Sequence, residues 1–338
     1  MSSGEFPLVS VVTPVYNGGE FIDACIKSVL SQTYPNLEHI IVNNCSKDRT
    51  LEIAQSYLPK DNRVRVHDAE DFVGVIENHN RAFGLMSPNA KYCKVVSADD
   101  WILPECLSEM VALAEQNPSV AMVGSYMLVG KQVVNTGLEY TRKIVRGREI
   151  CRATLLGGPY VFGTPSSLMY RADLVRASKA FYPNPNPHSD TTACYQVLQD
   201  WDFGFVHQVL AGATVHSETQ TSRSIKYGTI RRALIADLVR FGPVYLTKEE
   251  MDARVKHLMG YYYKWLIGAV VSNRRDRQFW PTQKAELEEV GLKLSYSEFG
   301  GAILQRGLDV LLEPRAALQK ITKLARRDPT KIEPQYYE

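Results

Sequence analysis

Hydrophobic and polar positions alternate along the first 125 residues in a pattern that predicts strands and helices in turn. Short apolar runs rich in β-branched residues, each followed by a polar turn, predict the strands. Apolar residues at helical spacing predict the helices between them. The expected strands are 8–13, 37–42, 64–67, one beginning at 92, and 120–123, and the expected helices are 21–30, 49–57, 77–86 and 105–117. This order is typical of a doubly wound, mostly parallel α/β sheet.

The second half of the chain has a different pattern. Between 127 and 214, short strand and helix signals are mixed with loops rich in glycine and proline. From about 226 onward, helical spacing dominates. The expected helices there are 230–240, 249–271, 284–290 and 301–312. We therefore expect a helical C-terminal region after the α/β part.

Two adjacent carboxylates, Asp99 and Asp100, follow the strand that begins at Tyr92. Open α/β sheets bind ligands at the carboxyl ends of their strands. Neighbouring carboxylates repel each other, and a hard cation such as Mg²⁺ or Mn²⁺ relieves that repulsion and can hold a diphosphate. The alternative is a solvated turn that caps the next helix, which Pro104 is expected to open. The pair alone leaves both interpretations open.

Composition and charge narrow the class of protein. The chain has 338 residues, 45% hydrophobic and 22% charged, which is typical of one large or two modest globular domains. A formal net charge of +2 gives no reason to expect a nucleic-acid partner. We expect neither a secretion signal nor a membrane span, because no apolar run approaches the roughly 20 residues that a span needs. The six cysteines include no Cys-x-x-Cys pair, which favours reduced thiols and a cytoplasmic location.

Four motifs, in this order, resemble those of the family 2 glycosyltransferases of the GT-A fold. They are SVVTPVYN at 10–17, SQTYPNLE at 31–38, IVNNCS at 41–46 and ADD at 98–100. The resemblance implies a nucleotide-diphospho-sugar donor, usually a UDP-sugar, a divalent cation, and inverting transfer to an acceptor hydroxyl. Similar features continue to about Ser224. A GT-A catalytic domain is therefore expected over 1–224 and a helical region over 225–338.

The resemblance also implies residues for the donor base. Thr13, Pro14 and Tyr16 stand where the family holds uracil, and a hydroxyl with an aromatic face suits a planar, polar base. The alternative for Tyr16 is a loop anchor. Asn44 stands where the family has an aspartate, and its amide oxygen can still accept the uracil N–H. Asn80, at the helix before the central strand, is expected to line the donor pocket, although an ordinary capping role is the alternative.

The expected metal ligands are Asp100, Asp99 and His216. Asp99 is assigned to the ribose or the metal, and Ser97 replaces an aspartate that the family often has at that position. His216 lies where GT-A enzymes often supply a further metal or phosphate contact, and an imidazole can serve either role. A lone histidine is also common as a structural residue.

Asp190 is implied as the catalytic base, because the family places a carboxylate at a comparable distance beyond the metal-binding pair and before a helix. Inverting transfer needs one carboxylate to take the proton from the acceptor hydroxyl. An aspartate directly before a helix is also a common N-cap, so that interpretation is the alternative.

The segment 315–327 places leucine and isoleucine on one helical face and five cations elsewhere, as an interfacial helix does. The alternative is a solvated helix that packs its apolar stripe on the domain. The first interpretation predicts peripheral contact with the inner face of the membrane.

Two functions of different classes follow from the sequence. The first is a metal-dependent inverting glycosyltransferase that extends a glycan or lipid-linked acceptor in polysaccharide or glycolipid biosynthesis. The second is a catalytically decayed GT-A protein that only binds a sugar nucleotide or acts as a scaffold. Asn43, Asn44 and Ser97, which depart from the family pattern, motivate the second hypothesis.

Overall fold

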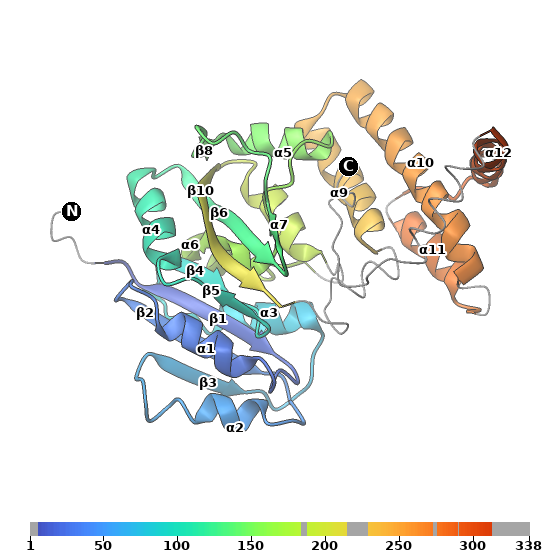
Figure 1. The fold of residues 1–338 in the computed structure, drawn as a ribbon. Coiled ribbons are helices and arrows are strands. Elements are labelled where there is room, and N and C mark those ends of the chain that lie inside the picture. The colour runs from blue at the N-terminus through green and yellow to red at the C-terminus, as the bar shows by residue number, and fades with distance from the viewer. Residues whose placement is uncertain (1–5, 184–187, 215–228, 273–275, 290, 313–338) are drawn as a thin grey trace. The chain divides into compact units, whose positions relative to one another are not determined.

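The computed structural model describes residues 6–183, 188–214, 229–272, 276–289 and 291–312 (Figure 1). The chain divides into two compact units, 1–215 and 216–338. The predicted boundary at 224 lies outside the described residues.

One sheet, ten-stranded within the described residues, forms the centre of the first unit. The main path runs β3 (Val64–Asp68), β2 (Leu37–Asn43), β1 (Val9–Val15), β4 (Tyr92–Val95), β9 (Leu168–Arg171), β6 (Val120–Val129), β10 (Asp202–Ala213) and β5 (Asp100–Ile102). Off this path, β7 (Gln132–Val134) pairs with β6, and β8 (Ile144–Val145) pairs with β10. The longest pairings, β1 with β2 and β6 with β10, are parallel, whereas β9 and β5 run antiparallel to their neighbours. The predicted α/β fold with a mostly parallel sheet is confirmed.

Helices cover both faces of this sheet (Figure 1). On one face, α1 (Ile22–Leu30), α2 (Thr50–Gln55) and α4 (Cys106–Gln116) bury their apolar stripes in aliphatic clusters. On the other face lie α3 (Val75–Gly84), α6 (Ala172–Ala177) and α7 (Ser189–Val197), where aromatic rings from helices and strands pack edge to face. The unit also contains α5 (Gly147–Leu155) and a 3₁₀ turn, η1 (Pro165–Ser167). Apolar side chains thus sandwich the sheet, as a doubly wound fold requires.

Of the strand boundaries that differ from the prediction, two lie next to the predicted site residues. Pro14 does not stop the first strand, which runs to Val15. The pairing of β1 with β4 ends at Val12, so the missing N–H of Pro14 leaves no gap in the ladder on that side. Asp100 does not simply end a strand either. It opens β5, a three-residue edge strand paired with β10, where a charged residue is tolerated.

The described residues of the second unit form four helices: α9 (Thr229–Tyr245), α10 (Lys248–Ser272), α11 (Phe279–Glu289) and α12 (Tyr296–Leu312). Each overlaps a predicted helix and extends beyond it. Aromatic and aliphatic side chains form their common core, and Arg232 is buried there with Nη1 2.8 Å from Gln283 Oε1. Within the described ranges, no helix is both long and apolar enough to cross a bilayer.

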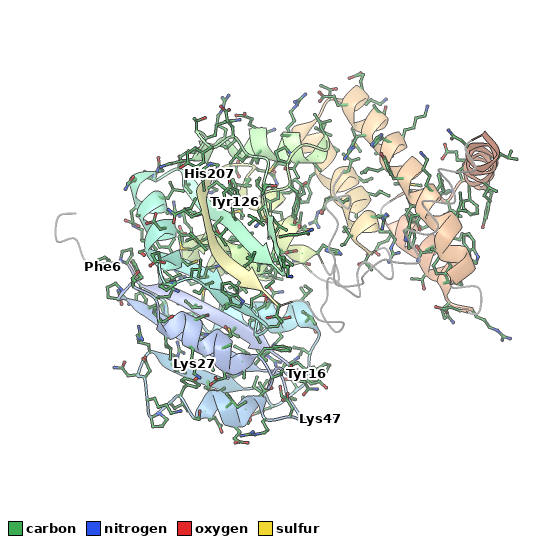
Figure 2. All side chains as sticks on the ribbon, viewed as in Figure 1. Phe6, Tyr16, Lys27, Lys47, Tyr126 and His207 are labelled. Atoms are coloured by element: carbon green, nitrogen blue, oxygen red, sulfur yellow. The ribbon has the colours of Figure 1, made fainter. Side chains whose placement is uncertain are left out.

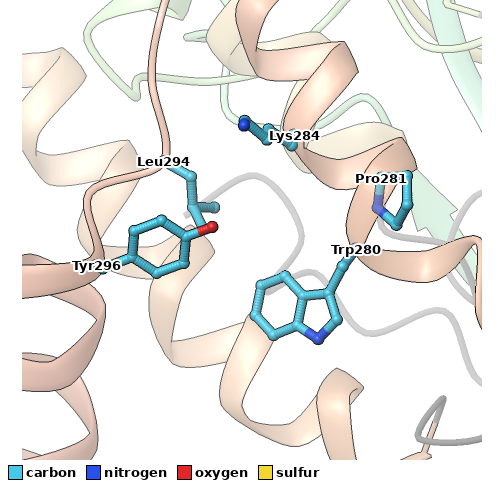
Figure 3. A pocket seen from close by; sticks show the side chains of 5 residues that line it. All are labelled: Trp280, Pro281, Lys284, Leu294 and Tyr296. Atoms are coloured by element: carbon cyan, nitrogen blue, oxygen red, sulfur yellow. The ribbon is translucent and has the colours of Figure 1, made fainter.

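A hollow of about 540 Å³ lies on this unit (Figure 3). Trp280, Pro281, Leu294 and Tyr296 supply its mainly apolar walls, and Lys284 is the cation at its rim. Carboxylates are absent from these five lining residues, so the hollow offers none of the acid–base or metal chemistry that the sequence predicts for the first unit.

Candidate functional site

Parallel pairing brings the predicted donor motifs to one edge of the sheet. Val15 at the end of β1 pairs with Asn43 at the end of β2. On the other side of β1, the Val96 N–H donates to Val12 O over 3.0 Å, which directs the chain after β4 to the same edge. Tyr16 and Asn44 directly follow the ends of β1 and β2, and the Asp99–Asp100 pair follows the end of β4 after three residues. The structure therefore brings these predicted residues together at the carboxyl edge.

Burial makes the carboxylate pair chemically unusual. Asp100 is only 7% exposed, and the hydroxyls of Ser97 and Ser166 lie beside its carboxylate. Burial, and then the neighbouring charge of Asp99, raise the pKa of Asp100 well above its usual range. Ser97, which stands where the family often has an aspartate, thus supplies a donor to the pair. Two such carboxylates favour a positive charge beside them.

The donor set fits a hard divalent cation. Asp99 and Asp100 offer carboxylate oxygens, which are the ligands that Mg²⁺ and Mn²⁺ prefer. No cluster of three or more His, Cys, Asp or Glu side chains suited to a metal occurs among the described residues. The third predicted ligand, His216, lies outside them. A cation at this pair would therefore need further oxygens from a bound diphosphate or from water.

Two aromatic rings stand beside the carboxyl edge. Tyr16 and Phe72 pack edge to face, with ring centroids 4.9 Å apart. They are 46% and 61% exposed, so their faces remain accessible to a ligand. Figure 2 places Tyr16 next to Lys47, whose backbone N–H donates to Asn17 Oδ1 over 2.8 Å. The sequence predicted Tyr16 but missed Phe72, which lies in the 69–74 loop without a motif of its own.

Asn44 holds that loop in place. Its Nδ2 donates to Val73 O over 2.8 Å, and its Oδ1 accepts the Val73 N–H over 3.0 Å. The side chain is 3% exposed. In this conformation the amide positions the backbone next to Phe72, and a direct contact with a base stays a prediction.

The two predicted base-binding side chains on the first strand are less accessible than that of Tyr16 in the loop. Thr13 is fully buried, and its hydroxyl lies 2.9 Å from His39 Nε2. Pro14 is partly buried one residue further on. Of the three predicted base-binding residues on this strand and its loop, Tyr16 has the most exposed side chain.

Asn80 acts on a different loop. Its Nδ2 donates to Tyr182 O over 2.7 Å, and its Oδ1 accepts the Tyr182 N–H over 2.9 Å. The Tyr182 ring is buried, and its hydroxyl lies 3.3 Å from that of Tyr170. Asn80 therefore fastens the chain shortly before Asp190, and its predicted place in the donor pocket stays a prediction.

Asp190 lies in the first turn of α7, whose N-cap residue is His188. The N-cap interpretation of Asp190 is therefore wrong. The nearby backbone N–H groups of Asp190 and Thr191 favour its ionised form, and its charge acts on the buried Tyr170 and Tyr182. Burial raises the pKa of Asp190 to about 6. This value suits a base that must be ionised at neutral pH and still accept a proton.

One segment, 160–168, contacts both carboxylate sites. The Tyr160 hydroxyl lies 2.6 Å from Thr191 Oγ1, next to Asp190. Six residues later, the Ser166 hydroxyl lies beside the Asp100 carboxylate and accepts the Ser97 N–H over 2.9 Å. Gly163 has φ +65°, and a Cβ there would lie 2.4 Å from Ser167 Oγ, so the turn requires glycine. The sequence marked 163–167 as a loop but gave no signal that Ser166 meets Asp100.

Comparison with known families agrees with this geometry. Residues 10–177 match the profile described as glycosyl transferase family 2. The chain belongs to this family. The matched range contains the edge motifs, the carboxylate pair and η1, whereas Asp190 lies just beyond it.

Curated relatives include bacterial glycosyltransferases. A glycosyltransferase of Haemophilus influenzae is 30% identical over 191 residues, which are 54% of this chain and 58% of that protein. A putative teichuronic acid biosynthesis glycosyltransferase, TuaG, of Bacillus subtilis is 34% identical over 119 residues, 35% of this chain and 46% of the relative. The chain thus spans about half the length of these relatives.

Solved structures share the fold. TarS 1–349 of S. aureus in complex with UDP-GlcNAc has a TM-score of 0.61 at 18% identity, covering 83% of this chain and 80% of TarS 1–349. The mannosyltransferase PcManGT of Pyrobaculum calidifontis, in complex with GDP-Man and Mn²⁺, has a TM-score of 0.53 at 14% identity, covering 90% and 80% of the two chains. These neighbours confirm the predicted GT-A type fold.

Proposed function

We propose that the protein is a metal-dependent inverting glycosyltransferase that moves a sugar from a nucleotide-diphospho-sugar to an acceptor hydroxyl. The main support for the proposal is that one segment, 160–168, lies against two separate carboxylate sites. One site is the Asp99–Asp100 pair, of which Asp100 is buried, and it is suited to a cation and a diphosphate. The other is Asp190, with a pKa of about 6, suited to take a proton. Inverting transfer needs one group to compensate the charge of the leaving diphosphate and a separate group to take the proton of the acceptor hydroxyl.

For the donor, we propose that the base stacks against Tyr16 and Phe72, with a UDP-sugar as the first choice. Exposed aromatic faces bind planar bases by stacking. Asn44 supports this binding by holding Val73 next to Phe72. UDP-GlcNAc in TarS and GDP-Man in PcManGT are consistent with a nucleotide-sugar donor here.

Asp99 and Asp100, with His216 as the third predicted ligand, are the residues that would hold Mg²⁺ or Mn²⁺. The cation would offset the negative charge of the leaving diphosphate. Ser97 and Ser166 orient the Asp100 carboxylate through their hydroxyls. Asp190, ionised above about pH 6, would take the proton of the acceptor hydroxyl as its oxygen attacks the anomeric carbon. The carbon–oxygen bond to the diphosphate then breaks, and the diphosphate keeps the electron pair.

For the acceptor, we propose a glycan or a lipid-linked glycan, processed in the cytoplasm at or near the inner face of the membrane. TuaG, named for teichuronic acid biosynthesis, supports a polysaccharide pathway. The segment 315–327, which motivates membrane contact, lies outside the described residues. Vesicle flotation of the full chain with and without this segment tests the contact. Binding to anionic vesicles that survives deletion would refute a role for the segment.

A panel of nucleotide sugars, incubated with the full chain and Mn²⁺ with and without glycan acceptors, tests the activity itself. Release of a nucleoside diphosphate from at least one donor, lost in the Asp190→Asn variant when acceptor is present, supports the proposal. Donor binding without release from any donor would favour the decayed, sugar-nucleotide-binding alternative.

A further inference from the structure

A lysine of the central sheet is fully buried close to the carboxylate pair, and its charge acts on Asp100. Lys94 is the third residue of β4, and its side chain has no exposed surface. An ammonium group without compensation is expensive to bury, so its partners must be unusually good. Neither the family motifs nor the proposed chemistry gives this residue a role.

The partners of Lys94 are main-chain carbonyls. Its Nζ donates to Ser166 O, to Leu168 O over 3.1 Å and to Val95 O over 3.4 Å. An ammonium has three N–H groups, so these three acceptors use its whole capacity. One of them belongs to Ser166, inside η1, and another to Leu168, which directly follows η1. Lys94 therefore ties η1 to β4.

The same turn carries the contact to Asp100. The Ser166 hydroxyl lies beside the Asp100 carboxylate and accepts the Ser97 N–H over 2.9 Å, and the Asp100 N–H donates to Ser97 O over 3.0 Å. Lys94 thus holds the main chain of Ser166, and the Ser166 side chain holds the turn from Ser97 to Asp100. A continuous chain of hydrogen bonds runs from the buried ammonium to the predicted metal ligand.

We propose that Lys94 is a positioning residue, which holds η1 so that Ser166 orients Asp100 toward a divalent cation. The proposal rests on the metal site of the proposed function and adds Lys94 as a residue that positions one of the metal ligands. Hydrogen-bonded partners behind metal ligands commonly change metal affinity by about 10- to 100-fold when they are removed. The alternative is that Lys94 acts only as a nearby positive charge.

The two alternatives predict opposite signs. Loss of a nearby cation alone would strengthen Mn²⁺ binding, because like charges repel. Loss of the hold on Ser166 would weaken it. Lys94→Met removes the charge and the hydrogen bonds while keeping an unbranched side chain. Ser166→Ala removes only the hydroxyl and leaves Lys94 intact, so it keeps the test valid if Lys94→Met fails to fold.

The experiment measures two quantities on the full chain: Mn²⁺ affinity by calorimetry, and hydrogen exchange of the Ser97 amide without metal or donor. Both variants should weaken Mn²⁺ binding about 10- to 100-fold and speed exchange at Ser97. The double variant should weaken it less than the product of the single effects, since both act through one contact. Arg232→Met, which removes a buried cation from the helical unit, and Ser125→Ala, which removes a buried hydroxyl from β6, should change neither quantity.

Tighter Mn²⁺ binding by Lys94→Met, or unchanged exchange at Ser97 in that variant, would overturn the proposal. If the wild type binds no Mn²⁺, the proposed function fails, and exchange at Ser97 still decides whether Lys94 controls Ser166. Equal effects from Arg232→Met would identify a general loss of stability and also overturn it.

Discussion

The two sides of the candidate site are built differently. On the nucleotide side, which comprises Tyr16, Phe72 and Asn44, the rings are half exposed and uncharged, and an amide braces the loop behind them. On the carboxylate side, which comprises Asp99, Asp100 and Asp190, burial raises the pKa of both Asp100 and Asp190.

This difference follows from what each side is proposed to do. Stacking requires accessible ring faces and depends little on the surrounding dielectric. Proton transfer and charge compensation gain strength where water is excluded. Substitutions on the carboxylate side should therefore reduce turnover strongly, whereas those on the nucleotide side should reduce donor affinity modestly.

The largest expected effect is on Asp190. Asp190→Asn keeps size and polarity but cannot accept the acceptor proton, so transfer should fall about 10²- to 10⁴-fold while donor affinity stays nearly unchanged. Single-turnover transfer at saturating donor measures this, with a melting temperature for each protein. Asp173→Asn is the matched control, because Asp173 also lies in the first turn of a helix. Near wild-type transfer by Asp190→Asn would refute the base assignment.

The pH profile should give the next largest effect. Asp190 must be ionised to act as a base, and its pKa is about 6. Transfer should therefore be constant above this pH and fall about tenfold per pH unit below it. An ordinary aspartate would keep the rate constant to about pH 4. A single-turnover profile from pH 4.5 to 8 that stays flat through pH 6 would contradict the raised pKa.

On the nucleotide side, Tyr16→Ala should weaken donor binding about tenfold, since stacking of a base on an aromatic ring is worth about 1–3 kcal/mol. The maximal transfer rate should change little, in contrast to Asp190→Asn. Phe72→Ala should act in the same direction. Tyr140→Ala, a 73% exposed tyrosine elsewhere in the unit, is the control. If Tyr16→Ala lost turnover while its donor affinity stayed unchanged, the proposed difference between the two sides would be wrong.

Asn44→Ala should have the smallest effect on the donor. It removes two hydrogen bonds to Val73, each worth about 0.5–1.5 kcal/mol, and part of that loss should appear as about threefold weaker donor binding. The rest should appear as a lower melting temperature. Asn117→Ala removes a single amide contact, to Leu113 O in α4, and should change stability only. A much larger loss of affinity in Asn44→Ala would indicate direct contact with the base.

Sequence reasoning predicted the first half of the fold well because those strands and helices have local signals. Apolar runs and helical spacing located β1 through β4 to within a few residues and the start of β6 at Val120, but they missed the last six residues of β6 and the edge strand β5. The position of β9, antiparallel between β4 and β6, depends on contacts between distant segments, which local patterns do not encode.

The candidate site divides in the same way. Motifs located Tyr16, Asp99 and Asp100, and family spacing suggested Asp190. Phe72 and Ser166 were missed, because their importance comes from a ring 56 residues away and a carboxylate 66 residues away in sequence. The partners of Asn44 were equally hidden, since an amide can bind a base or brace a loop with the same atoms.

The most direct test of the central claim is calorimetric titration of UDP into the full chain, with Mn²⁺ and then with EDTA. Because Asp99 and Asp100 face a diphosphate as like charges, binding should be at least about tenfold weaker with EDTA. The Asp100→Asn variant should lose most of that metal dependence. Equal affinity with Mn²⁺ and with EDTA would contradict a metal-held diphosphate at this carboxylate pair.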